Sequence, residues 1–239
     1  MKKAIKKRRN KGFGFPIFAL FTLAFCSVIA MLLVGGEETG EYFKQLNFIP
    51  DKKTICIDPG HGGVQSGATG EKGKRYEKDD TLRLSLLVRD ELIKKGYKVV
   101  MTREDDRDIS LSDRCKIANK NRASLFVSIH RNSGPPTGKG VEMWIHSKNP
   151  TDDNMLAQNI LNGMEKVGIS KNRGIHTGYR EGKDKDYYVN RNSKMPSCLA
   201  EIGFITNDED NKDFDEKLND YAKAIADGIE KTSKEMYLK

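Results

Sequence analysis

The sequence predicts an α/β protein, an open, mostly parallel, twisted sheet with helices on both faces, preceded by one N-terminal transmembrane or signal segment. Three observations favour this fold class. Short apolar runs alternate along the chain with amphipathic stretches of helical period. The run at 125–129 is apolar throughout, which is typical of a strand covered on both faces. The resulting strand–helix–strand–helix–strand order implies right-handed crossovers and parallel pairing.

Residues 54–101 predict a strand, a helix and a second strand. The apolar run at 54–57 leads into the glycine-rich segment Pro59-Gly60-His61-Gly62-Gly63. Residues 77–95 have helical period, and Gly96 is well suited to end this helix. The apolar face of the helix consists of Leu84, Leu87, Val88 and Leu92. The next predicted strand covers residues 97–101.

The same alternation continues toward the C-terminus. A second helix is predicted to begin after Ser110 and a third at 151–167, with hydroxyl side chains at Ser110 and Thr151 as caps. Further strands are predicted at 140–146 and 198–205. A C-terminal amphipathic helix carries Ala222, Ile225, Ala226 and Ile229. The segment 169–195 has no regular period and is predicted to be a long irregular loop, which in a compact domain is usually functional or mobile.

The N-terminus differs in composition from the rest of the chain. A basic segment at 1–12 precedes an apolar segment at 13–36, which is long enough to cross a bilayer. Basic residues before such a segment predict a cytoplasmic N-terminus and place the remainder outside. The apolar segment is either an uncleaved anchor or a cleaved signal peptide. Residues 37–51 are predicted to be a tether, and 52–239 the catalytic domain.

Charge and cysteine content exclude two classes of protein. Of the 42 Lys and Arg residues, seven lie in the first 36 residues, where none of the 34 acidic residues lies, so seven of the eight net positive charges belong to the N-terminus. The nearly neutral remainder predicts no nucleic-acid binding. Cys56, Cys115 and Cys198 lack CxxC spacing and occupy apolar positions, so they are predicted to be buried core residues rather than disulfides or zinc-knuckle ligands.

Two histidines stand at or just past the ends of predicted strands. His61 lies among glycines after the first strand, and His130 follows the apolar run at 125–129. Ligands collect at the carboxyl edge of an open α/β sheet, and two His plus one carboxylate form a catalytic zinc ligand set. Asp58, three residues before His61, is predicted to orient its ring. His146 and His176 fit surface histidines better than ligands, although either could contact substrate.

Two glutamates could complete this site. Glu77 stands at the start of the helix at 77–95, where it could face the His61 turn, although first-turn acids also simply complement the helix dipole. Glu201 lies in an otherwise apolar strand, where a carboxylate must be paired, bound to metal or catalytic. One of the two would bind zinc and the other would act as the base on the zinc-bound water. The residue pattern alone leaves their roles interchangeable.

Motifs spread over the outer domain resemble the zinc-dependent N-acetylmuramoyl-L-alanine amidases, a family that includes cell-separation, sporulation and phage-type enzymes. The resemblance covers residues 53–231. The motifs that carry it are 57–63, 77–79, Thr102-Arg103, Leu111 with Arg114, Ala118-Asn119, 128–132, 140–142 and 201–207.

This resemblance assigns roles that the pattern left open. It implies zinc ligation by His61, Glu77 and His130 and makes Glu201 the catalytic acid/base. The implied substrate is the amide between N-acetylmuramic acid and L-alanine in peptidoglycan, of the cell wall or spore cortex. The segment 169–195 is then predicted to line one wall of the substrate groove. Its candidate contacts are Arg173, Tyr179, Arg180, Tyr187 and Arg191.

Several questions stay open at this stage. Arg131 and Ser133 stand where the family usually has smaller residues, which predicts an effect on substrate fit but not on metal binding. No inserted autoinhibitory helix is expected between His130 and Glu201. The membrane segment is expected to hold the enzyme at the extracytoplasmic face of a bacterial membrane, with a protein activator as a further candidate partner. The competing functions are a wall- or partner-binding domain with little activity, and a zinc peptidase acting on stem peptides.

Overall fold

The protein was analysed as a computed structural model that describes residues 50–179 and 185–237. The elements in the first half are β1 (Asp51–Pro59), β2 (Thr69–Gly70), the 3₁₀ turn η1 (Glu71–Gly73), β3 (Arg75–Tyr76), α3 (Glu77–Lys94), β4 (Lys98–Met101), α4 (Leu111–Lys120) and β5 (Ala123–Asn132). Those in the second half are β6 (Val141–Ile145), α5 (Thr151–Val167), β7 (Asn172–Thr177), α6 (Tyr188–Asn192), β8 (Ser197–Phe204), α7 (Asp208–Glu216) and α8 (Leu218–Tyr237).

Within these residues, six strands form one mixed, mostly parallel sheet in the order β4-β1-β5-β8-β6-β7. The pairs β1–β4, β1–β5, β5–β8 and β6–β7 are parallel, and β6 runs antiparallel to β8. The sheet therefore has one group of four strands whose carboxyl ends share an edge, as the sequence predicted. A separate two-stranded hairpin joins β2 and β3.

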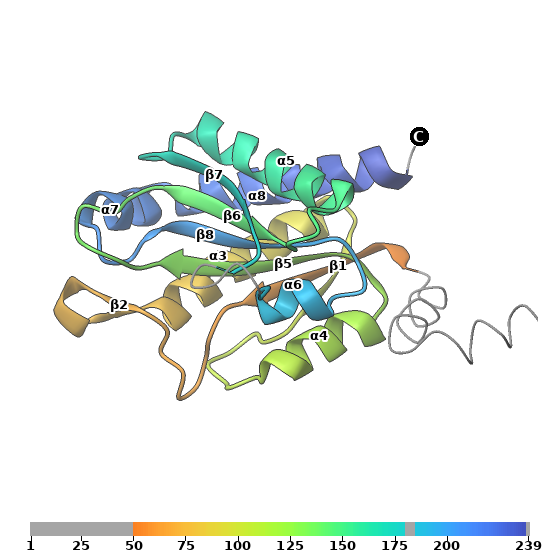
Figure 1. The fold of residues 1–239 in the computed structure, drawn as a ribbon, viewed down its shortest axis with the longest axis horizontal. Coiled ribbons are helices and arrows are strands. Elements are labelled where there is room, and N and C mark those ends of the chain that lie inside the picture. Colours follow the sequence, from red (N-terminus) through yellow and green to blue (C-terminus); the bar gives the residue numbers. More distant parts are fainter. Residues whose placement is uncertain (1–49, 180–184, 238–239) are drawn as a thin grey trace, which may run out of the picture. The chain divides into compact units, whose positions relative to one another are not determined.

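Helices cover both faces of the sheet, as predicted (Figure 1). Helices α3, α5 and α8 lie together on one face, while α4 and α6 pack on the other. On the helix α3, Leu84, Val88 and Leu92 are fully buried, whereas Leu87 is only partly buried at the rim of the core. The three cysteines in the described residues are buried and unpaired, which confirms their assignment to the core.

The segment 169–195, predicted to be an irregular loop, contains the strand β7 and the short helix α6. That prediction was wrong for two physical reasons. The strand β7 is an edge strand with half-exposed residues, so it lacks the apolar run that marks a covered strand. The helix α6 has five residues, too few to show a helical period.

Two predicted helix caps have different outcomes. The hydroxyl of Ser110 accepts a hydrogen bond from the Asp113 backbone N–H at 3.1 Å, which confirms it as the cap of α4. Thr151 is instead the first residue of α5, and Pro150 occupies the capping position without a side-chain hydrogen bond. Proline lacks a side-chain acceptor, so the start of α5 depends on packing rather than on a cap.

The predictions for the basic segment 1–12, the apolar segment 13–36 and residues 37–49 of the tether lie outside the described residues. The rest of the tether, which was predicted to reach residue 51, ends in the first residue of β1. Within residues 50–179 and 185–237, none of the helices combines the length and the apolar character that a membrane span requires.

Candidate metal centre and site pocket

The parallel strands β1 and β5 bring the two histidines together at the carboxyl edge of the sheet. Pro59 at the end of β1 pairs with Ile129 in β5, so the residues that follow them, His61 and His130, are neighbours. Their ring centroids lie 5.0 Å apart in an edge-to-face arrangement. Segments 69 residues apart in sequence therefore meet because their strands are parallel and adjacent, as the sequence predicted.

The carboxylate of Glu77, the first residue of α3, lies between the two imidazoles. Glu77 Oε2 is 3.1 Å from His61 Nε2, and Glu77 Oε1 is 2.9 Å from His130 Nδ1. One ligand atom from each of the three residues lies within 4.8 Å of the others. Two imidazoles and one carboxylate suit a catalytic zinc ion, which leaves its fourth position open. The donors present therefore fit the metal that the sequence predicted.

Backbone amides fix the Glu77 carboxylate in this place. The N–H of Ala68 donates to Glu77 Oε2 at 2.8 Å, and the N–H of Arg131 donates to Glu77 Oε1 at 3.1 Å. Burial opposes ionisation of Glu77, but the hydrogen bonds with His130 and His61 outweigh it and hold its pKa well below the ordinary range. The carboxylate is therefore ionised at neutral pH, the state in which it can bind a cation.

Two glycines are required by close packing around this group. A Cβ on Gly60 would lie 2.4 Å from the ring of His130. A Cβ on Gly67, where φ is +68°, would lie 2.6 Å from both Glu77 Oε2 and His61 Cδ2. Any side chain at either position would displace a member of the group.

Asp58 does not act as predicted. Its buried carboxylate accepts hydrogen bonds from Thr102 Oγ1 at 2.5 Å, Ser128 Oγ at 2.7 Å and Arg114 Nη1 at 2.7 Å, rather than from the His61 ring. Arg114 Nη2 in turn donates to the backbone oxygen of His61 at 2.7 Å. Asp58 is thus linked to the backbone of His61 through Arg114 and not to its ring.

Glu201 lies in β8, one strand beyond His130. It is the register partner of His130 in β5 and of Glu142 in β6, so the three side chains share one face of the sheet. Glu201 is 8% exposed and is not a member of the His61–Glu77–His130 group. The two glutamates that the residue pattern left interchangeable therefore occupy different places.

Glu142 is a further buried carboxylate at this edge, and reasoning from the residues alone missed it. It accepts hydrogen bonds from Asn132 Nδ2 at 2.8 Å and Trp144 Nε1 at 3.0 Å. Burial opposes its ionisation, but the Arg173 guanidinium 2.5 Å away, together with Trp144, lowers the pKa of Glu142. The segment 140–142, which contains Glu142, was noted only because it is one of the motifs that resemble the family.

A pocket of about 400 Å³, here called the site pocket, opens beside the two histidines. It is lined by Asp58, His61, Gln65, Leu111, Arg114, His130, Tyr179, Lys185, Asp186, Tyr187, Tyr188, Val189, Arg191 and Leu199. Tyr179, Tyr187 and Arg191, predicted to line the substrate groove, thus line the same pocket as two members of the His61–Glu77–His130 group, here called the metal group. Arg173 lies outside this lining, against Glu142 and the Phe204 ring, and Arg180 lies outside the described residues.

His146 and His176 lie away from the metal group, as expected. His146 Nε2 is 3.5 Å from an oxygen of Asp186, and the ring of His176 packs 4.8 Å from the ring of Trp144. Neither belongs to the cluster of potential metal ligands.

Arg131, which was predicted to affect substrate fit but not metal binding, is absent from the lining of the site pocket. Its side chain is fully buried, pairs with Asp80 at 2.5 Å and lies over the Phe214 ring, so it does not reach the site pocket. Its backbone N–H, however, holds Glu77. Alternation along β5 explains this, because His130 points toward the site and the next residue points to the opposite face. The contact of Arg131 with Glu77 thus comes from the backbone, whereas its side chain packs away from the His61–Glu77–His130 group.

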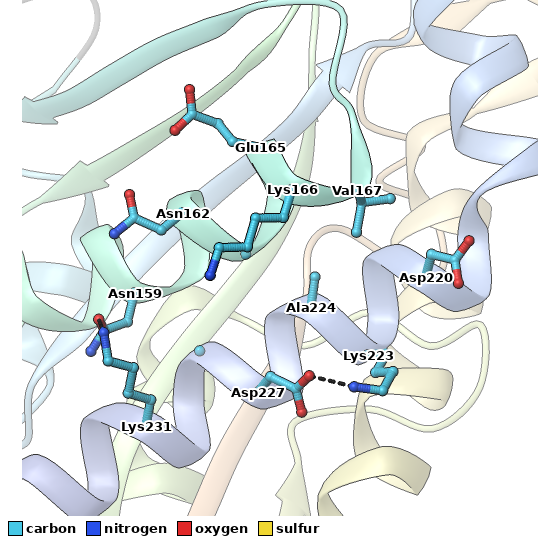
Figure 2. A pocket seen from close by; sticks show the side chains of 12 residues that line it. Asn159, Asn162, Glu165, Lys166, Val167, Asp220, Lys223, Ala224, Asp227 and Lys231 are labelled. Carbon is cyan, nitrogen blue, oxygen red and sulfur yellow. Dashed lines mark hydrogen bonds and ion pairs between the residues drawn. The ribbon is translucent and has the colours of Figure 1, made fainter.

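A larger pocket, of about 690 Å³, lies between α5 and α8 (Figure 2). Its lining alternates acids, amides and lysines, among them Asp227 and Lys223, which pair at 2.6 Å. None of the predicted site residues belongs to it. The larger of the two pockets is therefore not the one that adjoins the candidate metal ligands.

The sequence matches the family model of N-acetylmuramoyl-L-alanine amidases over residues 55–231. It is 39% identical over 181 residues to YqiI of Bacillus subtilis, covering 74% of this chain and 84% of the relative. It is 32% identical to the probable cell wall amidase LytH of Staphylococcus epidermidis, over 74% of this chain and 57% of that longer protein.

Solved structures agree with this match. The amidase AmiC2 of Nostoc punctiforme superposes with a TM-score of 0.67 and 37% identity, covering 77% of this chain and 98% of that one. The CwlD amidase of Clostridioides difficile, solved in complex with the GerS lipoprotein, superposes with a TM-score of 0.69 and 29% identity, covering 75% and 98%. The chain therefore belongs to the N-acetylmuramoyl-L-alanine amidase family.

Proposed function

We propose that this protein hydrolyses the amide bond between N-acetylmuramic acid and L-alanine in peptidoglycan, with zinc as its cofactor. The observation that carries the proposal is the His61–Glu77–His130 group beside the site pocket, with a buried carboxylate between two partly exposed histidines, in a chain of the amidase family. These three residues are the proposed zinc ligands. A zinc ion bound there supplies Lewis-acid polarisation of the scissile carbonyl and lowers the pKa of a bound water.

Glu201 is the proposed catalytic acid/base. Its place next to His130, but outside the ligand group, supports this role. Glu201 takes the proton from the attacking water and returns it to the amine of the leaving L-alanine. The Glu142 carboxylate beside it is held by Arg173, Trp144 and Asn132, so it stays fixed while Glu201 exchanges its proton.

The wall of the site pocket is proposed to bind the glycan-peptide substrate. Tyr179 and Tyr187, whose rings pack 4.8 Å apart, offer apolar faces with hydroxyl groups, and Arg191 offers a cation. Such side chains stack on sugars and pair with carboxylates. The proposed substrate, peptidoglycan of the wall or of the spore cortex, contains both sugars and carboxylates.

Peptidoglycan as substrate also supports an extracytoplasmic location. We propose that residues 13–36 act as a membrane anchor or signal segment, so that residues 52–239 form a catalytic domain outside the membrane. The CwlD amidase was solved with a lipoprotein, and an activating protein is accordingly proposed as a partner here. Beyond residue 36 the net charge is close to zero, so we do not propose a nucleic acid as a partner.

Mass spectrometry of muropeptides after digestion of purified peptidoglycan tests this function. An amidase frees the amino group of L-alanine and leaves the glycan intact. Cleavage within the stem peptide would instead identify a zinc peptidase. Binding to the wall without any new product, with and without candidate activators, would identify a binding domain.

A further inference from the structure

A buried arginine next to the metal group has contacts that the proposed chemistry does not use. Arg103 follows β4 and is only 2% exposed. Its Nη2 donates to the backbone oxygens of Gly60 at 2.8 Å and Lys78 at 2.7 Å. Its Nε donates to the backbone oxygen of Pro59 at 3.1 Å, and Nη1 to that of Asp105 at 3.0 Å.

Two of these contacts adjoin proposed zinc ligands. Gly60 directly precedes His61, and Lys78 directly follows Glu77. One nitrogen of Arg103 thus binds the peptide oxygens beside two ligands that come from different elements, the turn after β1 and the first turn of α3. Because both hydrogen bonds are short, they restrict the distance between these two backbone segments.

Thr81 forms a second bridge between the same two oxygens. Its Oγ1 lies 2.8 Å from the Gly60 oxygen and 3.1 Å from the Lys78 oxygen, and Arg103 Nη2 is 3.1 Å from this hydroxyl. The two side chains therefore form one buried hydrogen-bond network around the two peptide groups.

The conformation of His61 requires such support. Its φ is 58°, in the left-handed region that residues with a side chain rarely adopt. Such a conformation persists only where the surrounding structure holds it. Arg114 holds the His61 oxygen and Arg103 holds the preceding one. Two arginines from separate elements thus maintain the turn that presents the His61 ring.

The hydrogen bonds of Arg103 satisfy backbone oxygens, but none of them pairs its positive charge with an anion. Among the described residues, no carboxylate lies within ion-pair distance of Arg103, and every oxygen that it contacts is neutral. Burial, followed by repulsion from Arg114, lowers its pKa. A buried cation without a paired anion is costly, so the benefit must lie in the geometry that its five donors impose.

We propose that Arg103 is a positioning residue that sets the distance between His61 and Glu77 and thereby the affinity of the site for zinc. The proposal rests on the proposed function only in taking zinc as the bound ion. Arg103 contacts neither substrate nor metal; it acts through the peptide groups of Gly60 and Lys78.

Zinc affinity of the full-length protein, measured by competition with a chromophoric chelator, tests the proposal. Arg103→Met should bind zinc at least about tenfold more weakly, the scale on which partners behind metal ligands act. Arg103→Lys, which keeps the charge but not the fork of donors, should fall between this variant and the wild type. Arg89→Met is the matched control, because within the described residues the ion pairs of Arg89 join it to Asp90 and Glu104 and not to the peptide groups of Gly60 and Lys78.

Two further measurements separate positioning from general stabilisation. Cobalt substituted for zinc should give an altered visible spectrum in Arg103→Met at full occupancy, because the ligand geometry changes. The melting temperature of the metal-free protein reports stability by itself. A lower melting temperature together with the wild-type zinc affinity and cobalt spectrum would reduce Arg103 to a structural residue and overturn the proposal.

The remaining outcomes are also decisive. If Arg103→Met does not fold, Arg103→Lys and Thr81→Val are compared with the wild type, and unchanged zinc affinity in both would overturn the proposal. A wild-type protein that binds no zinc would contradict the proposed function itself. A wild type that binds zinc, with Arg103→Met equal to it, contradicts only the role given to Arg103.

Discussion

The two sides of the site pocket are built in different ways. On the metal side, His61, Glu77 and His130 come from the ends of central elements, and the Glu77 carboxylate is held by two backbone amides. On the opposite side, Tyr179, Tyr187 and Arg191 come from the region of β7 and the five-residue helix α6, and they are half-buried or exposed.

This difference shows how one site serves two requirements. A metal ion needs its ligands fixed within fractions of an ångström, and hydrogen bonds from backbone amides, such as those that Ala68 and Arg131 donate to Glu77, achieve this. A polymeric substrate is bound by many weaker contacts that can adapt, which short segments with aromatic and cationic side chains supply. Changes on the metal side should therefore be severe, and changes on the pocket wall graded.

The largest effect is expected when two ligands are removed together. The double variant His61→Ala/His130→Ala leaves Glu77 as the single remaining donor of the group, so zinc should be lost and hydrolysis should become undetectable. Elemental analysis of protein purified without chelators, alongside a muropeptide assay, measures both. Full zinc content in the double variant would refute the ligand assignment.

The next effect separates the two glutamates. Glu201→Gln keeps the shape of the side chain but cannot accept a proton, so hydrolysis should fall by about two to four orders of magnitude while zinc content stays full. Glu77→Gln should instead weaken zinc binding and activity together. Metal loss in Glu201→Gln, with metal retained in Glu77→Gln, would show that the roles are reversed.

A buried carboxylate away from the metal should control stability rather than catalysis. Burial raises the pKa of Asp153, at the start of α5, to about 6. Because its folded-state pKa lies above the unfolded value, this group favours folding below about pH 4, and that contribution is lost as the pH rises to 6. Asp153→Asn should remove this loss of unfolding free energy, which is up to about 3 kcal/mol.

Thermal unfolding of the metal-free protein between pH 4 and pH 7 measures this effect. The melting temperature of Asp153→Asn relative to the wild type should increase across this range. Asp58 gives a contrast, because Arg114, Thr102 and Ser128 outweigh the effect of its burial and lower its pKa. Its contribution to stability is present above about pH 4 and is lost in more acidic solution. A constant difference between Asp153→Asn and the wild type would contradict the assignment.

The smallest effect is expected on the pocket wall. Tyr187→Ala removes a ring that packs on Tyr179 and Trp144, so KM should rise about two- to tenfold, the worth of one aromatic contact, with full zinc content. Tyr237→Ala is the control, because Tyr237 contacts Lys52 at the start of β1. Wild-type kinetics in Tyr187→Ala would exclude this wall from substrate binding.

Sequence patterns determined the parallel part of the sheet and the meeting of His61 with His130. Apolar runs marked β1, β5 and β8, and parallel strands place their carboxyl ends at one edge. Hydrophobic period and composition did not reveal elements that have only one covered face or only a few residues. Such elements are β7, α6 and the charged helix α7, whose buried residues are Asp210, Asn211 and Phe214.

The residue pattern alone did not separate Glu77 from Glu201, although the family resemblance did; the tertiary structure placed the two residues and showed which groups hold the Glu77 carboxylate. A sequence pattern shows that a carboxylate lies near a strand end, but not toward which neighbour it points. That direction depends on the register of β8 against β5, on the backbone amides of Ala68 and Arg131, and on the reach of Arg103 from β4. These contacts join residues far apart in the chain, so local propensity and period carry no record of them.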